Sequence, residues 1–272
     1  MAKESFLTAS EQRLGGRLLH DGFVIEPCET VSNLESLRNT LLDEVNQRLK
    51  LHGCTSQVDE LKNSHLCVPA NIINDIRLHL FAFLNTLPNV RRHYFDFAST
   101  LLQALVGNEL SMQNKVNLSI QQPSDQSSVL ELHSDVWSGD SPFQVVLWVP
   151  LTDANSTNSM FLLPPEISRQ AYLRAREGEL DSMSKIHEAY RGSFVNIEAK
   201  FGEIVIFDSN CLHGNQLNTT NTSRWSLNCR FSSLLAPTTT PERRLGPYYS
   251  PILVRPATKM GMNALEALGL LE

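Results

Sequence analysis

The chain has 272 residues, 42% of them hydrophobic and 19% charged, with a formal net charge of −6. This composition is typical of a globular protein with a substantial core, and the acidic balance argues against nucleic acid as a partner. No apolar run reaches the roughly 18 residues of a membrane span, and the N-terminus lacks a signal-peptide core. The five cysteines include no C-x-x-C pair, which argues against a disulfide framework. Together these features predict a cytoplasmic protein without a membrane partner.

The first part of the chain, residues 1–109, is predicted to be mainly helical. A short strand over 21–27 is closed by proline. A capping-box pattern at 32–35 then begins a helix whose leucines recur at helical spacing up to Gly53. Two more helices are expected, over about 69–87 and about 89–106.

From residue 110 the pattern changes to short strands. Residues 111–122 alternate between an apolar face and a polar face that carries Gln113, Lys115, Asn117, Ser119 and Gln121. Further strands are predicted over 130–137, 143–151, 159–163, 193–200, 203–208 and 224–234. A charged, helix-favouring insert occupies 166–189, and a short helix is expected at about 262–270.

Helices followed by many short strands indicate an α+β chain. We predict a single domain with a double-stranded β-helix core (a cupin-like jelly roll) over 110–235. The N-terminal helices of 1–109 should pack on one of its sheets, and 236–272 should form a C-terminal extension.

His133 and Asp135 are candidate metal ligands because side chains two residues apart share one face of a strand. An imidazole and a carboxylate supply two of the three ligands in a 2-His-1-carboxylate iron site. His213, which follows a strand and precedes Gly214, is the candidate third ligand. Each residue also has a simpler interpretation, as a surface histidine or a turn aspartate, and Asp208 either orients His213 or caps a turn.

Arg224 and Ser226 share one face of the strand 224–234, and Asn228 and Arg230 continue that face. The opposite face is apolar and should be buried. A guanidinium beside a hydroxyl suits the carboxylate of a small diacid, whereas an exposed salt bridge is the alternative interpretation.

The ordered set of His133-x-Asp135, His213 and Arg224 with Ser226 resembles the Fe(II)/2-oxoglutarate-dependent oxygenase superfamily, most closely its phytanoyl-CoA-hydroxylase-like branch. The stretches DGFVI at 21–25, LWVPLTDA at 147–154, NSMFLLPPEIS at 158–168 and GEIVIFD at 202–208 extend this resemblance over most of residues 20–235. A narrower similarity is to the bacterial subgroup of carbohydrate and aminoglycoside biosynthesis clusters. The usual Pro-Gly-Ser-His turn is replaced here by the sequence from Pro165 to Ser168.

The resemblance implies that His133, Asp135 and His213 bind Fe(II). It also implies that Arg224, helped by Ser226, binds the far carboxylate of 2-oxoglutarate. Such an enzyme consumes O2 and 2-oxoglutarate, releases succinate and CO2, and oxidises an unactivated C–H bond. The retained aspartate argues against a halogenase.

A residue of the polar strand, Asn117, is a candidate to bond the keto-acid end of 2-oxoglutarate, unless it simply faces solvent. Lys115, Trp137 and Arg230 are candidate substrate contacts, with core packing for the tryptophan or a surface charge for the arginine as alternatives. His187 could reach the site if the insert is a lid.

The expected activity is hydroxylation of a small polar metabolite, such as a sugar derivative or natural-product intermediate. A CoA thioester, desaturation and cyclisation remain open. So do two other classes: an inactive cupin-like binding or regulatory protein, and an iron enzyme that does not use 2-oxoglutarate. The insert 166–189 is either a lid or a contact in a homodimer.

Overall fold

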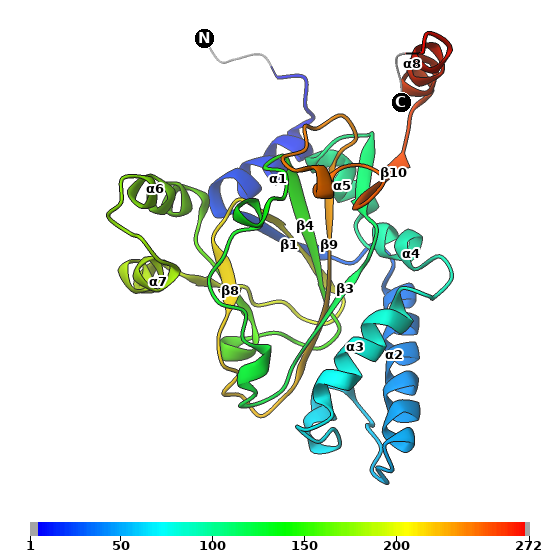
Figure 1. Cartoon of the computed structure of the whole chain (residues 1–272), viewed down its shortest axis with the longest axis vertical. Helices are drawn as coiled ribbons and strands as arrows, with labels where there is room; N and C mark the ends of the chain where they lie inside the picture. The colour runs from blue at the N-terminus through cyan, green and yellow to red at the C-terminus, as the bar shows by residue number, and fades with distance from the viewer. Residues whose placement is uncertain (1–4, 270–272) are drawn as a thin grey trace.

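The computed structural model describes residues 5–269, and in them helices precede and flank an antiparallel β core (Figure 1). The α-helices are α1 (Ala9–Asp21), α2 (Val31–Leu51), α3 (Ile73–Leu84), α4 (Val90–Asp96), α5 (Ser99–Leu105), α6 (Pro165–Arg176), α7 (Met183–Ala189) and α8 (Pro256–Ala267). The strands are β1 (Phe23–Pro27), β2 (Leu110–Gln113), β3 (Asn117–Gln121), β4 (Gln144–Pro150), β5 (Met160–Leu162), β6 (Val195–Asn196), β7 (Glu203–Asp208), β8 (His213–Asn215), β9 (Arg224–Ser233) and β10 (Tyr249–Leu253).

The strands form a large and a small sheet. The large sheet has the order β1-β7-β4-β9-β2-β10, and β3 also pairs with β9; the small sheet has the order β6-β5-β8. The pairs within both sheets are antiparallel. The predicted α+β class with a jelly-roll core is confirmed, and β8 and β9 carry His213 and Arg224 on the two different sheets.

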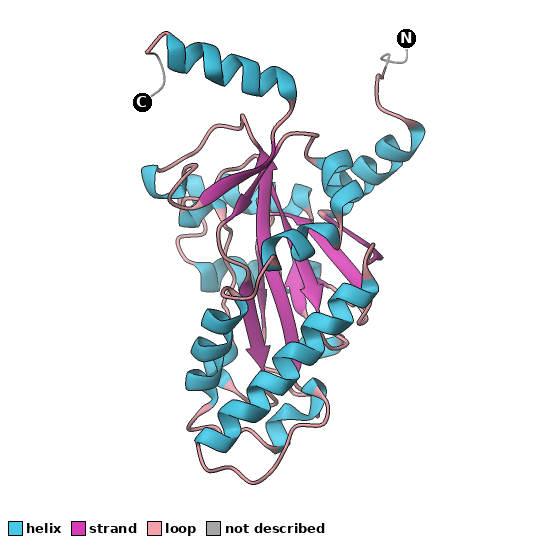
Figure 2. Ribbon diagram, turned by 90° about the vertical axis from the view of Figure 1, so that its right-hand side faces the viewer, coloured by secondary structure: helices cyan, strands magenta, loops and turns pink. Residues whose placement is uncertain are grey.

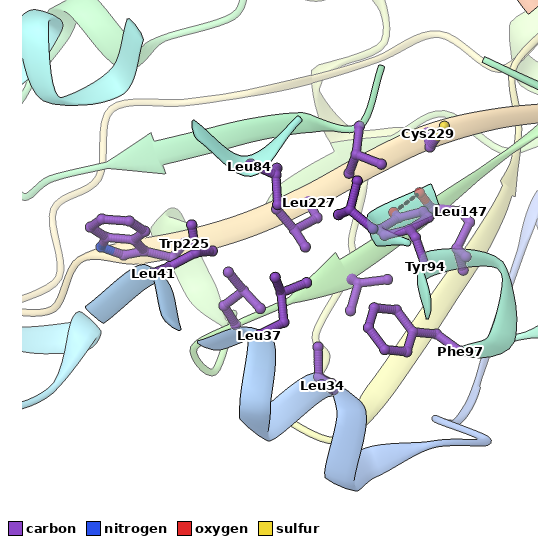
Figure 3. Packing of buried hydrophobic residues seen from close by; sticks show 14 of the residues in the cluster. Leu34, Leu37, Leu41, Leu84, Tyr94, Phe97, Leu147, Trp225, Leu227 and Cys229 are labelled. Carbon is purple, nitrogen blue, oxygen red and sulfur yellow. Dashed lines mark hydrogen bonds between the residues drawn. The ribbon is translucent and has the colours of Figure 1, made fainter. Parts of the chain in front are cut away.

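The outer face of the large sheet is buried under the N-terminal helices, as predicted. Leucines of α2 and α3 pack on Leu147 of β4 and on Trp225 and Leu227 of β9 (Figure 3). The Tyr94 hydroxyl donates to the carbonyl oxygen of Leu147 at 2.7 Å, so the polar atom of this buried ring is satisfied.

The inner face of the large sheet faces the small sheet. Val146 and Trp148 of β4 pack there against β5 and β7, which explains why β4 is buried along its whole length. In β9 the alternation places Arg224, Ser226 and Arg230 on this inner side, because Trp225 and its apolar neighbours occupy the outer core.

Several N-terminal predictions were wrong in detail. Helix α1 was not predicted, although Thr8 and Glu11 form a capping box at its start. The capping box predicted at 32–35 does not exist, because α2 begins after Thr30, which makes no side-chain cap. The single helix predicted over 89–106 is two helices, and the carboxylate of Glu29 accepts hydrogen bonds from the amide of Thr100 in the first turn of the second.

The strand predicted over 111–122 is also divided, into β2 and β3. The side-chain amide of Asn85 bonds both the amide and the carbonyl of Val116, so this residue cannot continue a β ladder. The break leaves Lys115 in the bend between the strands, with an exposed side chain.

Helix α8 begins earlier than predicted, at Pro256, and residue 270 of the predicted helix lies outside the described residues. It projects from the body in both views (Figures 1 and 2) and carries no buried residue. Its start is held by Glu109, whose carboxylate accepts hydrogen bonds from the amide of Arg255 and the hydroxyl of Thr258, each at 2.8 Å.

Across residues 5–269, no helix combines the length and the apolar character needed to cross a bilayer.

Candidate metal centre

The segment 130–137 is not the strand that alternation predicted. His133 makes only an isolated β-bridge to His213, and Asp135 has helical backbone angles (φ −60°, ψ −37°) at the start of the 3-10 helix Val136–Ser138. The bridge sets His133 beside β8, and the turn then brings Asp135 round to the same place. The side chains therefore converge for a reason other than strand alternation.

The three candidate ligands meet in space. One ligand atom from each of His133, Asp135 and His213 lies within 4.8 Å of the other two. Nδ1 of His133 donates to the carbonyl of Glu131 at 2.8 Å, and Nδ1 of His213 donates to the carbonyl of Cys211 at 2.9 Å. Each neutral ring therefore has its proton on Nδ1 and its lone pair on Nε2, as a metal ligand requires.

The electrostatics of the group also suit a divalent cation. Burial lowers the pKa of His213 to about 4, so its imidazole is neutral near pH 7. Burial opposes ionisation of Asp135, but the charge and the hydrogen bonds of Arg230 help to outweigh it, and the pKa of this carboxyl group is lowered. Two imidazoles and one carboxylate form the donor set typical of non-heme Fe(II), so the residues fit the metal.

Arg224 is a buried cation with no carboxylate partner among residues 5–269. Its guanidinium donates to the carbonyl of Asn158 at 3.0 Å, the hydroxyl of Ser226 at 2.6 Å and the side-chain oxygen of Gln121 at 3.2 Å, which are all neutral acceptors. Burial lowers its pKa to about 10, which still leaves it protonated near neutrality. Since a buried charge is costly without a counter-ion, Arg224 is suited to receive an anion.

Arg224 and the three candidate ligands line one cavity of about 110 Å³. Val146, Trp148 and Phe207 supply apolar wall, and Ser119, Asn215 and Asn228 supply polar wall. A small molecule in this cavity would contact both a metal ion and the guanidinium.

The structure gives Arg230 a partner that the sequence did not predict. It lines the cavity, but its guanidinium is paired with both oxygens of Asp135, Nη2 to Oδ1 at 2.6 Å and Nε to Oδ2 at 3.0 Å. Its charge is therefore already balanced by Asp135, which suits a substrate anion less well than an unpaired guanidinium would.

Two other candidate substrate contacts lie away from this cavity. Lys115 is exposed in the bend before β3 and does not line it. Trp137 is 46% exposed and stands edge-on to Tyr172, with ring centroids 4.7 Å apart. It belongs neither to the cavity wall nor to the core, so neither interpretation of this tryptophan holds.

The two remaining supporting candidates, Asn117 and Asp208, do not line the cavity themselves. Asn117 donates to the side-chain oxygen of Asn228 at 3.0 Å, and only Asn228 lines the cavity. Asp208 accepts hydrogen bonds from Asn210 and none from His213, so the carbonyl of Cys211 is what orients that ring.

The insert forms α6 and α7 beside the metal centre. No residue of 166–189 lines the 110 Å³ cavity. His187 instead walls a second hollow of about 350 Å³ and lies against Phe194, with ring centroids 4.9 Å apart. Ser168, in place of the usual turn, accepts a hydrogen bond from the amide of Leu212 and so ties α6 to the residue before His213.

Two polar residues of the site were not predicted. Asn215 accepts a hydrogen bond from the amide of Leu130 at 2.6 Å and so holds the segment leading to His133. Its position two residues after His213, on the same strand face, could have revealed it. Asp140 is buried beside Arg230, and no local pattern marks it.

Comparisons with known proteins agree with this arrangement. The sequence model of the family described as phytanoyl-CoA dioxygenase (PhyH) matches residues 29–226. No curated protein matches the sequence significantly.

Solved structures share the fold at low sequence identity. AviO1 from Streptomyces viridochromogenes is 16% identical, with 87% of this chain and 100% of that chain covered and a TM-score of 0.51. HygX from Streptomyces hygroscopicus, with nickel and 2-oxoglutarate bound, is 14% identical, with 91% and 98% covered and a TM-score of 0.50. EctD from S. alaskensis in its apoform is 18% identical, with 89% and 82% covered and a TM-score of 0.51.

Proposed function

This chain belongs to the phytanoyl-CoA dioxygenase family and is an Fe(II)- and 2-oxoglutarate-dependent dioxygenase, and from that premise we propose that it hydroxylates a small, polar, uncharged metabolite. The observation that carries the assignment of residues is the buried, unpaired guanidinium of Arg224 in the same cavity as His133, Asp135 and His213. A dicarboxylate cosubstrate needs both features together.

In this proposal His133 and His213 hold Fe(II) through Nε2, and Asp135 holds it through its carboxylate. Arg224 binds the far carboxylate of 2-oxoglutarate, and Ser226, buried beneath it, fixes the fork through the 2.6 Å hydrogen bond from Arg224. The iron and 2-oxoglutarate, when bound, supply the oxidation of a C–H bond by O2 that no side chain can perform. The protein's part is placement, and Trp148 and Phe207 help exclude water from the cavity.

The nature of the cavity wall supports an uncharged polar substrate. Arg230 is paired with Asp135, so Arg224 is the remaining unpaired cation among the described residues of this wall. Ser119, Asn215 and Asn228 offer hydroxyl and amide groups. A sugar derivative or related natural-product intermediate, with several hydroxyl groups, suits these donors and acceptors better than an anion or a bare lipid.

The test is anaerobic addition of Fe(II) and then 2-oxoglutarate to the folded protein. We expect a visible charge-transfer absorption that grows with 2-oxoglutarate, and release of succinate when O2 and a suitable hydroxylated compound are added. A well-folded protein without this absorption would instead be an inactive cupin-like binding protein. Absorption without succinate release, across sugars, sugar derivatives and CoA thioesters alike, would contradict the substrate class.

A further inference from the structure

A second buried carboxylate, that of Asp140, lies beside the candidate ligand Asp135, and the two share the guanidinium of Arg230. We propose that Arg230 and Asp140 are positioning residues of the metal centre. Arg230 holds Asp135 in place, and Asp140 accepts the Nε–H of Arg230 when Asp135 turns an oxygen toward a metal ion. This inference rests on the proposed role of His133, Asp135 and His213 as metal ligands.

Arg230 occupies both oxygens of the candidate ligand. Its Nη2 lies 2.6 Å from Oδ1 of Asp135 and its Nε lies 3.0 Å from Oδ2, which is the bidentate geometry of a strong ion pair. The pair is well buried, with side-chain exposures of 16% for Arg230 and 3% for Asp135. Metal coordination through one of these oxygens competes with a donor that already holds it.

Asp140 has a buried oxygen that can take this donor. The residue is 1% exposed, and its Oδ2 lies 3.3 Å from Nε of Arg230 yet makes no hydrogen bond to any described residue. Buried carboxylate oxygens are normally hydrogen-bonded, so an acceptor left open within reach of a shared donor calls for an explanation. A small rotation of the guanidinium would transfer Nε–H from Asp135 to Asp140.

The surroundings hold Asp140 where this transfer needs it. Its amide donates to the carbonyl of Asp135 at 3.1 Å, which fixes the two residues relative to each other through the main chain. Its Oδ1 lies 3.3 Å from the hydroxyl of Tyr249 and 3.7 Å from Nε of Arg243. A divalent charge at Asp135 repels the guanidinium, and Oδ2 of Asp140 is the acceptor on its other side.

The test is a double-mutant cycle on metal affinity, without turnover. Co(II) binding is measured anaerobically by calorimetry for wild type, Asp140→Asn, Arg230→Gln and the double variant. Tyr249→Phe is the control, because it removes a hydroxyl that lies near Oδ1 of Asp140 and bonds Gln144, and leaves Oδ2 of Asp140 and Arg230 in place. We expect Asp140→Asn to weaken Co(II) binding by about 10- to 100-fold, as loss of an outer-shell partner does. The same substitution should have little effect in the Arg230→Gln background, and Tyr249→Phe should have little effect at all.

If Asp140→Asn weakens Co(II) binding equally in the wild-type and Arg230→Gln proteins, Asp140 acts on the metal through space and not through Arg230. If Asp140→Asn leaves Co(II) affinity unchanged, Asp140 does not act on the metal centre. Either result overturns the inference. If a variant fails to fold, the proposal can still be tested by NMR on the unsubstituted protein. The 15N resonance of Arg230 Nε should shift on addition of Zn(II), and an unshifted resonance contradicts the proposal. If His133→Ala keeps full Co(II) affinity, the proposed ligand set is wrong. This variant therefore distinguishes failure of the ligand assignment from failure of the positioning role of Arg230 and Asp140.

Discussion

The main chains of His133 and His213 bind each other in both directions, each amide nitrogen lying 2.9 Å from the carbonyl oxygen of the other. The spacing of the two imidazoles is therefore set by backbone hydrogen bonds, and their ring centroids lie 4.3 Å apart. Removing one imidazole should leave the other where it is, so the ligands can be tested singly.

His133→Ala should weaken Co(II) or Fe(II) binding by more than about 100-fold, because loss of an outer-shell partner alone costs about 10- to 100-fold. The backbone bridge does not need the side chain, so the unfolding midpoint in urea should change little. Anaerobic calorimetry measures the affinity. His187→Ala is the matched control, since His187 lies in the adjacent hollow and should leave binding unchanged; a similar loss in both variants would argue against the ligand assignment.

Arg224→Ala should raise the dissociation constant for 2-oxoglutarate by at least about 100-fold while leaving Co(II) affinity close to wild type. Breaking one side of a buried ion pair costs about 3–5 kcal/mol. Arg224→Lys should recover part of the loss, because it restores the charge without the bidentate fork. The measurement is anaerobic titration of the iron-loaded protein.

Asn117→Ala should have a smaller effect on that titration, because its amide reaches the cavity only through Asn228. If Arg230→Ala raises the dissociation constant for 2-oxoglutarate more than Arg224→Ala does, then Arg224 is not the arginine that binds 2-oxoglutarate.

Gly214→Ala should disturb the metal centre through the main chain. A Cβ at this position would lie 2.8 Å from the carbonyl oxygen of Leu130 and 3.1 Å from that of Glu131, which holds Nδ1 of His133. Overpacking of this kind costs about 1–3 kcal/mol. Urea unfolding should show that loss together with weaker Co(II) binding.

Gly192→Ala is the control for this prediction, because nothing lies within 4 Å of its Cβ position. Unchanged Co(II) affinity in a destabilised Gly214→Ala protein would show that Gly214 serves the fold and not the site.

The ion pair between Arg77 and Asp125 should make the free energy of unfolding depend on pH in the acid range. Arg77 of α3 also donates to the carbonyl of Ile120, so the pair helps join α3 to β3. Burial raises the pKa of Asp125, but hydrogen bonds from Ser127 and Arg77 outweigh it and lower the pKa below its usual value. The pKa of Asp125 is lower in the folded than in the unfolded protein. The ion pair therefore contributes its full stabilisation above the unfolded-state pKa of about 4, and this stabilisation is lost as pH falls through the folded-state pKa.

Asp125→Asn should therefore cost about 1–3 kcal/mol at pH 7 and less at pH 3, measured by urea unfolding at the two values. Asp43→Asn, on the exposed face of α2, is the matched control and should cost little at either pH. A cost for Asp125→Asn that is the same at both pH values would contradict the linkage.

Strand β9 shows what the sequence could predict. Its alternation placed Trp225 and Leu227 in the outer core and Arg224 and Ser226 on the inner face, because a period of two follows directly from strand geometry. Strand β7 and the buried run of β4 were predicted for similar local reasons.

The segment that carries His133 and Asp135 shows what local patterns could not predict. Whether it formed a strand depended on β8, a three-residue strand that pairs with it at one bridge only. The turn after Asp135 and the left-handed Gly139 place Asp135 and Asp140 beside Arg230. Which carboxylate a guanidinium finds is settled by tertiary structure, so the role of Arg230 could not be read from its strand face.

Helix α8 touches the rest of the protein through the hydrogen bonds of Arg255 and Thr258 at its start, and water surrounds its later turns. A cysteine introduced at exposed Asn263 would therefore accept a fluorophore or a linker to a solid support far from the metal centre between the two sheets.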